Sequence, residues 1–376
     1  MEWFTEMLVL AQVVYSILIM VPIFYWFSLK VFSGEESVSQ NLPITERRIC
    51  LILPMRNEIT NVERKLTGII EEILPHKFVD LIVADSDSDD GTKEAAEKIL
   101  ISSRMDRSRW KIMNFEIRGK NVAINAVLAE VEAEIVIISD ADAEVSPGWL
   151  EIIRIRMEEE DVGVVSGVER EESGNLGGFN GYYRGKSNWL RIRESEIYST
   201  PVLEGSILAW KTSSLGAFRL NEKMNADDAQ IGFISMRGGY RSIIDERIAF
   251  RSFEGSPERT FRESVRRAQG LSIALLKNSD LAVSSPRRSL RRVVFNAIFL
   301  YVIFPWASLL FVVNSIVSFS LNPELGNTWE FYSIISLVLV ILSPQGRFVS
   351  RGVAISIIAH CQALVGKSYR NWEPNR

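Results

Sequence analysis

The sequence predicts an α/β fold, a Rossmann-like mixed sheet covered by helices, with hydrophobic helices at both ends of the chain. Two observations support this prediction. Between about residues 46 and 280, short aliphatic runs alternate with segments that carry apolar residues at helical spacing. Long apolar stretches precede and follow that region. We therefore expect an N-terminal transmembrane anchor at 1–33, a central domain at 46–280 and a C-terminal membrane region at 290–376.

The N-terminal apolar stretch, residues 7–32, has no charge before Lys30. It exceeds the roughly 20 residues that a helix needs to span a bilayer. Glu2 and Glu6 stand where a signal peptide normally has basic residues, and no small-residue cleavage site follows, so we expect an uncleaved anchor. Lys30 and the arginine pair at 47–48 follow the stretch, which places the central domain in the cytoplasm by the positive-inside rule.

Three more apolar stretches lie near the C-terminus. Residues 293–321 form a long run, and residues 329–343 and 352–365 form shorter ones near the lower length limit for spanning. Basic residues flank the last stretch, so that it could instead lie along the membrane interface. We expect a multi-pass protein with three spans, and the sequence leaves the role of the fourth stretch open.

The central region alternates strand-like and helix-like segments in a regular order. The pattern predicts strands at 48–54, 79–85, 110–117 and 134–140, and helices at 61–74, 92–100 and 120–131. Such alternation indicates a mainly parallel sheet with helices on both faces, in which ligands bind at the carboxyl ends of strands. Two predicted strands end in aspartate clusters, at Asp85 and Asp140. The glycine-rich segment 173–185 is expected to be a flexible loop rather than a phosphate cradle.

Composition argues against several functional classes. A net charge of −4 and a pI near 5.6 disfavour nucleic-acid binding through a basic surface. Two cysteines and two histidines provide neither a disulfide framework nor a zinc cluster, and they make Ser-His-Asp hydrolysis a poor candidate. The glycine signatures of dinucleotide-binding and P-loop proteins are also absent from the sequence.

The first aspartate cluster, DSDSDD at 85–90, needs positive charge or hydrogen-bond donors nearby, because its carboxylates repel one another. An EF-hand calcium loop is the first candidate. However, Asp90 stands where that loop requires glycine, and Ala96 stands where it requires the closing glutamate. The calcium interpretation therefore fails.

A series of short motifs decides between the remaining interpretations by its order along the chain. In sequence these are LPMRNE, ADSDSDDGT, GKNVAIN, SDADAEVSPGWL and NADDAQIGFISMRGGYR. The series resembles the family 2 glycosyltransferases, which have the GT-A fold, the fold of nucleotide-diphospho-sugar transferases. The resemblance covers roughly residues 48–270 and lies nearest to the ceramide glucosyltransferase and cellulose-synthase-like branch.

The resemblance implies a donor site and a metal site. A UDP- or GDP-sugar is the expected donor, Asp85 accepts a hydrogen bond from its base, and Lys120 helps to hold its diphosphate. Asp140 and Asp142 are the expected ligands of Mg²⁺ or Mn²⁺, which favour carboxylate oxygens together with substrate phosphates. Other expected substrate-binding positions are Pro54, Asn57, Glu58, Asp140 and Gly205. Asp90 and Thr92 are expected to cap the turn after Asp85, whereas Asp87 and Asp89 form a solvated part of it.

The resemblance also assigns catalytic residues. Asp227 and Asp228 match the acidic pair of the family, and Asp228 is the expected general base. An acceptor hydroxyl needs such a base, because it is a weak nucleophile until its proton is removed, whereas a polyprenyl phosphate acceptor does not. The family inverts the anomeric configuration by a single displacement. DADAEVSPGWL also lacks the acidic, proline-rich continuation typical of dolichol-phosphate mannosyltransferase relatives, which favours a hydroxyl acceptor.

One motif departs from the family pattern. Relatives of the cellulose-synthase-like branch carry Gln/Arg-x-x-Arg-Trp, but here Glu263, Arg266 and Arg267 occupy the first, fourth and fifth positions. Without the tryptophan, processive polymerisation is not expected. Arg266 is expected to bind substrate phosphate, although a basic helix on an anionic membrane surface is the alternative.

The sequence thus predicts a hexosyltransferase of the cell membrane with a cytoplasmic catalytic domain. Its expected partners are a nucleotide-sugar, a lipid or lipid-linked glycan acceptor and membrane lipids, with no nucleic acid. The alternatives are a polyprenyl-phosphate glycosyltransferase, a sugar-phosphate nucleotidyltransferase and a non-catalytic membrane scaffold with a GT-A domain. This sequence lacks the glycine-rich start of a nucleotidyltransferase, which argues against that alternative. A scaffold would not need to keep Asp85, Asp140, Asp142 and Asp228, and all four are present.

Overall fold

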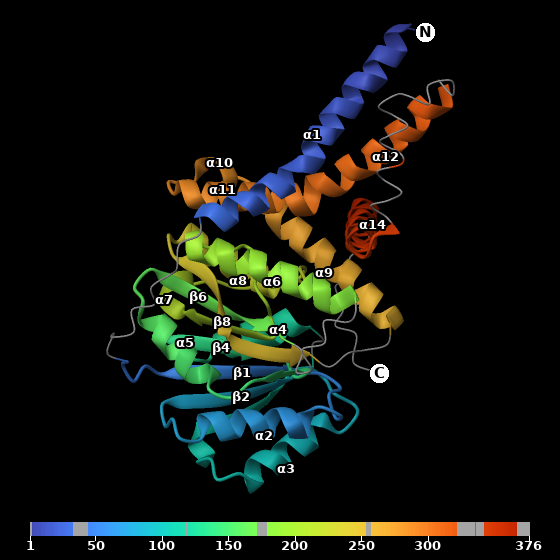
Figure 1. Ribbon diagram of the computed structural model, residues 1–376. Coiled ribbons are helices and arrows are strands. Elements are labelled where there is room, and N and C mark those ends of the chain that lie inside the picture. Colours follow the sequence, from blue (N-terminus) through green and yellow to red (C-terminus); the bar gives the residue numbers. More distant parts are fainter. Residues whose placement is uncertain are drawn as a thin grey trace. The chain divides into compact units, whose positions relative to one another are not determined.

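A computed structural model describes residues 2–32, 44–116, 119–170, 179–252, 257–321, 335 and 342–366 (Figure 1). The chain divides into two compact units. One comprises Met1–Phe32 and Pro257–Ser368 and is helical where it is described. The other comprises Ser33–Ser256 and Tyr369–Arg376 and contains the β-sheet.

The first half of the sheet unit follows the predicted order of strands and helices. Its elements are β1 (Ile49–Met55), α2 (Val62–Ile73), β2 (Val79–Asp85), α3 (Thr92–Ser102), the short 3₁₀ helix η1 (Arg107–Arg109), β3 (Trp110–Asn114), α4 (Lys120–Leu128) and β4 (Ile135–Ser139). Each predicted strand and helix of this region is present, and β3 and α4 each end three residues earlier than predicted. Hydrophobic periodicity therefore identified the type and order of these elements correctly.

The second half of the unit differs from the sequence prediction in the glycine-rich segment. Its elements are β5 (Ala143–Val145), α5 (Trp149–Glu158), β6 (Val162–Glu169), α6 (Phe179–Ile197), β7 (Ile207–Lys211), α7 (Thr212–Leu215), α8 (Asp227–Arg237) and β8 (Arg241–Ser252). The loop prediction for 173–185 is wrong at 179–185, which lie in α6, whereas 173–178 lie outside the described residues. Glycine costs a helix only about 1 kcal/mol per residue, so the packing of the rest of α6 can outweigh it.

The sheet has eight strands in the order β3-β2-β1-β4-β7-β6-β8-β5. Strands β3, β2, β1 and β4 run parallel to one another, whereas β7 is antiparallel to both β4 and β6, and β5 is antiparallel to β8. The predicted mixed sheet is confirmed. Every residue of β1 is buried, as expected for a strand whose sheet is covered on both faces.

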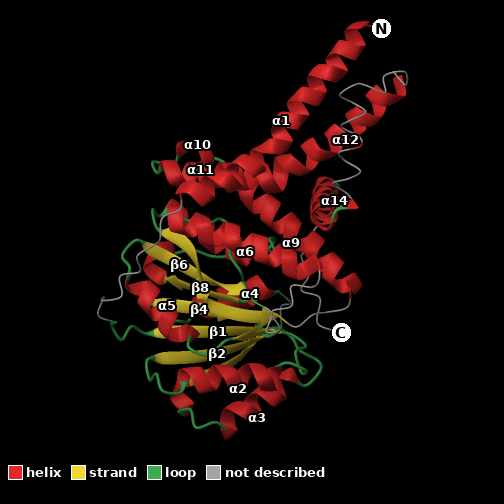
Figure 2. Ribbon diagram, in the orientation of Figure 1, coloured by secondary structure: helices red, strands yellow, loops and turns green. Residues whose placement is uncertain are grey.

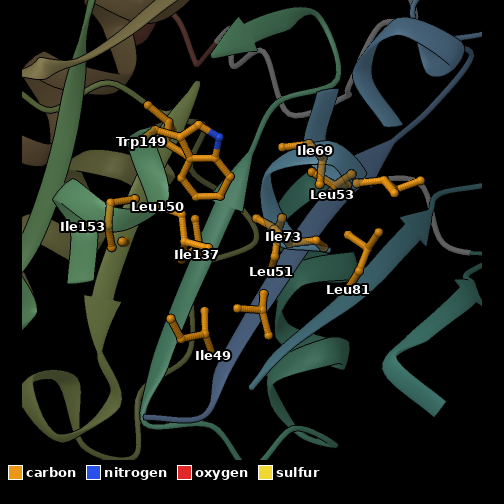
Figure 3. Close-up of a cluster of buried hydrophobic side chains, with 14 of the residues drawn as sticks. Ile49, Leu51, Leu53, Ile69, Ile73, Leu81, Ile137, Trp149, Leu150 and Ile153 are labelled. Carbon is orange, nitrogen blue, oxygen red and sulfur yellow. The ribbon is translucent and has the colours of Figure 1, made fainter. Parts of the chain in front are cut away.

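Alternate residues of β1 point into two hydrophobic cores. Leu51 and Leu53 pack with residues of α2 and α5, and Figure 3 shows this cluster with Ile73 and Trp149 among its members. Ile52 belongs to the opposite core, which includes residues of α4 and α8. These last two helices therefore lie on the same face of the sheet, and their N-termini carry Lys120 and Asp227.

The helical unit consists of elements from both ends of the chain (Figure 2). They are α1 (Glu2–Phe32), α9 (Pro257–Lys277), α10 (Leu281–Ser284), α11 (Arg288–Ile298), the π-helix η2 (Phe299–Ile303), α12 (Phe304–Leu321) and α14 (Pro344–Leu364). Within the described ranges, two helical stretches are long and apolar enough to cross a membrane, Glu6–Val31 and Arg288–Leu321. Most of the predicted stretch 329–343 lies outside the described residues, and the stretch 352–365 falls almost entirely within α14.

Polar side chains join the two long helices of this unit. Gln12 on α1 is fully buried and donates a hydrogen bond to Ser315 Oγ on α12 at 2.7 Å. Asn314 Nδ2 donates to Gln12 Oε1 at 2.7 Å and to the backbone oxygen of Leu8 at 3.0 Å. These bonds fix the pairing of α1 with α12, because each buried polar group needs its partner on the other helix.

Candidate active site

Two loops at the carboxyl ends of β1 and β2 are joined by side-chain hydrogen bonds. Asn57 Nδ2 donates to Asp89 Oδ1 at 2.8 Å, and Asp89 N donates to Asn57 Oδ1 at 2.9 Å. Asn57 adopts a left-handed backbone conformation (φ 54°), which asparagine tolerates better than most residues. Asp89 is exposed, as predicted for the turn, but it also holds the loop after β1 in place.

Asp90 and Thr92 shape the start of α3 as predicted. Asp90 Oδ1 accepts hydrogen bonds from Thr92 N at 3.0 Å and Thr92 Oγ1 at 2.5 Å, and Asp90 Oδ2 accepts one from Ile59 N at 3.1 Å. Burial acts to raise the pKa of Asp90, but these hydrogen bonds outweigh it and lower the pKa below its usual value. The turn therefore keeps a charged carboxylate at the N-terminus of α3.

Asp85, the last residue of β2, is 1% exposed. Its Oδ2 accepts a hydrogen bond from Ser88 N at 3.2 Å, whereas its Oδ1 has no partner within the described part of the chain. A buried carboxylate oxygen without a donor is costly unless a ligand supplies one. The predicted contact with an N–H group of a nucleotide base would supply this donor, and it stays a prediction.

Lys120 joins the second aspartate motif to the acidic pair. Its Nζ lies 2.8 Å from Asp140 Oδ1 and 2.7 Å from Asp227 Oδ2. Burial disfavours the charged form of Lys120, but the two carboxylates outweigh that effect and raise its pKa above the usual range. Gly205 borders this cluster, because a Cβ there would lie 3.6 Å from Lys120 Nζ and 3.8 Å from Asp140 Oδ2. The structure thus brings four of the predicted site residues together.

Asp228 lies next to this cluster but has different surroundings. The side chain is half-buried, and its Oδ1 accepts a hydrogen bond from Ala229 N at 2.7 Å. Burial, followed by the negative charges of Asp227 and Glu204, raises the pKa of Asp228 to about 7. A carboxylate with a pKa near the working pH can both accept and release a proton, which is what a general base requires.

Asp140 and Asp142 follow β4 and are both half-buried. Burial, together with the charges of Asp142 and Asp227, raises the pKa of Asp140. Their oxygens are the ligand type that Mg²⁺ and Mn²⁺ prefer, and these ions commonly use one or two carboxylates plus substrate phosphates and water. Among the described residues, no group of three or more acidic, histidine or cysteine side chains forms a complete metal cage. A metal held by this pair would need further oxygen ligands, such as water or substrate phosphate.

Comparison with known proteins identifies the family. The model of the family described as "Glycosyl transferase family 2" matches residues 50–245, just over half of the chain. The chain belongs to glycosyl transferase family 2. It is therefore a glycosyltransferase, and the family predicted from its motifs is confirmed.

Two relatives of this family 2 glycosyltransferase show how far the likeness extends. Glycosyltransferase AglE of Haloferax volcanii is 28% identical over 103 residues, which are 27% of this chain and 33% of that protein. The match thus spans about a third of the relative's length. The solved structure of a mannosyltransferase of Pyrobaculum calidifontis, in complex with GDP-Man and Mn²⁺, has a TM-score of 0.76 and 22% identity. The match covers 95% of this chain and 100% of the mannosyltransferase chain, so the two proteins share their fold over nearly the whole length.

Lys65 is a buried charge near the site of the glycosyltransferase that the sequence motifs did not indicate. Lys65 on α2 is 5% exposed, and its Nζ donates to Ser139 Oγ at 2.7 Å and to the backbone oxygen of Ala143 at 2.6 Å. These two partners flank the Asp140–Asp142 turn. Burial lowers the pKa of Lys65 to about 8, despite the carboxylates nearby. Its position on the apolar stripe of its helix, three residues after Val62, was the available signal.

Two asparagines on α4 hold the loop that precedes the acidic pair. Asn125 Nδ2 donates to Leu220 O at 2.9 Å, and Asn125 Oδ1 accepts from Leu220 N at 2.8 Å. Asn121 Nδ2 donates to Asn221 O at 3.1 Å and to Met224 O at 2.8 Å. Both asparagines are 6% exposed. Their spacing of four residues, which places them on one face of a helix, was the signal in GKNVAIN.

Three predicted substrate-binding residues lie outside the contacts described above for the cluster of Lys120, Asp140, Gly205 and Asp227. Pro54 is buried in β1 beyond Ile52, the last β1 residue paired with β4, so its missing N–H breaks no bond to that strand. Glu58 is buried and accepts a hydrogen bond from Asn61 Nδ2 at 2.8 Å. Arg266 lies on α9 in the helical unit. Substrate binding by these three residues stays a prediction.

Proposed function

We propose that this glycosyltransferase moves a sugar, with inversion, from a nucleotide-diphospho-sugar to a hydroxyl group of a lipid or lipid-linked acceptor at the cytoplasmic face of the membrane. The observation that carries the proposal is Asp228. Its carboxylate has a pKa raised to about 7 and adjoins the cluster of Lys120, Asp140 and Asp227. A general base is needed for a hydroxyl acceptor but not for an acceptor that is already an anion.

The donor is proposed to bind along the carboxyl ends of β1, β2 and β4. Asp85 Oδ1 accepts a hydrogen bond from the base, which gives this buried oxygen the donor it lacks among the described residues. Lys120 contacts the diphosphate with its ammonium group. The mannosyltransferase of similar fold was solved with GDP-Man and Mn²⁺, so GDP-mannose is the first donor to test, followed by UDP-sugars.

Asp228 is proposed to take the proton of the acceptor hydroxyl as its oxygen attacks the anomeric carbon. The bond from that carbon to the diphosphate oxygen breaks in the same step, so one displacement inverts the configuration. Asp227 remains paired with Lys120 and keeps the ammonium near the leaving diphosphate. Asp140 and Asp142 would hold Mg²⁺ or Mn²⁺, which supplies charge neutralisation for the departing diphosphate.

The membrane setting supports a lipid or lipid-linked acceptor. Glu6–Val31 and Arg288–Leu321 are proposed to span the bilayer, with the sheet unit in the cytoplasm. The basic residues near their ends support this orientation. An acceptor anchored in the same bilayer would then need only lateral diffusion to reach the enzyme. Arg266 is proposed to bind substrate phosphate, and the absence of a tryptophan at position 267 favours transfer of a single sugar.

The test is a transfer and hydrolysis assay with purified full-length protein in lipid. GDP-mannose and UDP-sugars are offered with Mn²⁺ or Mg²⁺, and diphosphate release is measured for wild type, Asp142→Ala and Asp228→Asn. We expect metal-dependent release that both substitutions abolish. Full transfer by Asp228→Asn would indicate a polyprenyl phosphate acceptor. Absence of donor binding under every condition would support the non-catalytic scaffold.

A further inference from the structure

The ammonium group of Lys120 occupies a position between two acidic elements of the site. Its Nζ forms ion pairs with Asp140 Oδ1 and Asp227 Oδ2, at 2.8 and 2.7 Å. The side chains of the three residues are 20%, 28% and 11% exposed, so water screens the two ion pairs only partly. Lys120 therefore neutralises much of the negative charge that would otherwise attract a cation to Asp140.

The same carboxylate is one of the two proposed metal ligands. A free divalent ion at Asp140 and Asp142 would meet a positive charge already ion-paired with one of its ligands. The described residues offer it no third acidic, histidine or cysteine ligand in the same group. Mg²⁺ and Mn²⁺ need about six oxygen ligands, so most of them must come from water or substrate.

We propose that Lys120 makes metal binding conditional on the nucleotide diphosphate, so that the site selects the metal–diphosphate complex over the free metal ion. The inference rests on the proposed function, because it takes Asp140 and Asp142 as the metal ligands. In the nucleotide-free protein the ammonium serves as the counter-ion of Asp140 and Asp227. When the diphosphate binds, its negative charge lies between Lys120 and the metal. Both cations are then attracted to the diphosphate, and this attraction outweighs the repulsion between them.

The electrostatic argument fixes the direction of the effect. Charges a few ångströms apart in a partly buried site interact strongly compared with thermal energy, so removing the ammonium changes cation affinity by tenfold or more. Without nucleotide, its removal strengthens metal binding because two carboxylates lose their internal counter-ion. With nucleotide, its removal weakens binding because the diphosphate loses one of its cations. The free-energy coupling between metal and diphosphate is thus larger with Lys120 than without it.

The experiment measures Mn²⁺ binding to the full-length protein by electron paramagnetic resonance, first alone and then with saturating GDP or UDP. For Lys120→Met we expect affinity for free Mn²⁺ to rise about tenfold and the gain in Mn²⁺ affinity upon nucleotide addition to shrink by about the same factor. Lys120→Arg keeps the charge and should resemble wild type. Asp227→Asn removes one partner of Lys120, so its ammonium group pairs with Asp140 alone. Free Mn²⁺ should therefore bind no more tightly than in wild type.

The outcomes separate this inference from the function on which it rests. If Lys120→Met binds free Mn²⁺ no more tightly than wild type, while Asp142→Ala abolishes binding, the inference is wrong and the metal site stands. If Asp142→Ala leaves Mn²⁺ binding unchanged with and without nucleotide, the metal assignment fails and the inference fails with it. Lys120→Gln replaces Lys120→Met if thermal melting shows that the methionine variant does not fold.

Discussion

Asp227 and Asp228 are adjacent in sequence but lie in different electrostatic surroundings. Asp227 is paired with the Lys120 ammonium 2.7 Å away, whereas the pKa of Asp228 is raised to about 7 by burial and by neighbouring charges, with that of Asp227 first among them. One helix N-terminus therefore presents two carboxylates in different electrostatic states. The first is paired with a cation, and the pKa of the second lies near neutral pH, as the proposed general base requires.

The raised pKa of Asp228 predicts a pH dependence of the reaction. Only the deprotonated carboxylate can act as base, so kcat/KM should rise as the pH increases and reach a plateau above a midpoint of about 7. Asp228→Asn should lower kcat by roughly 10²–10⁴-fold and remove this rise. Initial rates between pH 5.5 and 9, with metal saturating throughout, test the prediction. A flat profile in wild type would contradict it.

The same shift predicts that Asp228→Asn stabilises the protein. A carboxyl group whose pKa is raised in the folded state holds its proton more tightly there than in the unfolded chain, where its pKa is about 3.9. The free energy of unfolding of wild type therefore falls as the pH rises from about 4 to 7, and asparagine escapes this loss. At pH 8 we expect the free energy of unfolding of the variant to exceed that of wild type by at least about 1 kcal/mol. This difference corresponds to a melting temperature higher by roughly 2–4 °C. The difference should vanish near pH 4, and thermal melts at both pH values would show whether it does.

Gly205→Ala should lower activity without lowering stability. The added Cβ would lie 3.6, 3.8 and 4.0 Å from Lys120 Nζ, Asp140 Oδ2 and Asp227 Oδ2, which are ordinary contact distances, so nothing clashes. The methyl group would nevertheless fill space beside the groups that we assign to diphosphate and metal. We expect kcat/KM to fall by about tenfold, as for a misplacement of reacting groups, with an unchanged melting temperature.

Gly163→Ala is the matched control for that substitution. Its Cβ would lie 2.3 Å from Ser235 Oγ, away from the site, so it should lower the melting temperature by forcing neighbours apart. Loss of stability in Gly205→Ala, comparable to that in Gly163→Ala, would show that position 205 is a packing position instead.

Asn125→Leu should impair the catalytic step more than donor binding. Leucine has a similar size but leaves the N–H and C=O of Leu220 without their partners, which loosens the loop leading to the acidic pair. We expect kcat to fall roughly 10–100-fold while the Kd for GDP or UDP, measured by calorimetry, changes by less than about threefold. Glu222→Ala removes one exposed acceptor of the same asparagine and should have little effect.

A double-mutant cycle shows whether Asn125 acts through Asp228. If it does, Asn125→Leu should cost little further activity in the Asp228→Asn background, because the group it positions is already lost. Equal losses in both backgrounds would place its effect elsewhere in the site.

The parts of the fold that depend on local patterns could be predicted from the sequence. Strand β2 was predicted at its observed bounds, because an aliphatic run followed by a polar turn has few alternative conformations. Asp140 was also expected at the ligand-binding edge, since parallel strands place their carboxyl ends at one edge of the sheet. Gly205 reaches the same edge for another reason, because it precedes β7, which is antiparallel to β4. Asp85 was correctly placed at such a strand end, whereas the base contact assigned to it stays a prediction.

Other features depend on contacts between distant segments and could not be predicted from local patterns. Lys65 contacts residues 74 and 78 positions away, and Asn125 contacts a loop 95 positions away. A lysine on an apolar stripe indicates only that a partner must exist, and the partner becomes known with the tertiary structure. The start of α6 was missed for a related reason, because tertiary packing outweighed the low helix propensity of its glycines.

The hydrogen bond between Asn314 and Gln12 has a consequence for how the protein is made. The two residues are 302 positions apart, and at about 5–20 residues per second a ribosome needs roughly 15–60 s to synthesise the chain between them. If α1 enters the membrane as proposed, the side-chain amide of Gln12 lies in the hydrocarbon region for that time without its hydrogen bond to Asn314. Nascent chains halted before α12 should therefore be cleared by quality-control proteases faster than the finished protein, and Gln12→Leu should slow their removal.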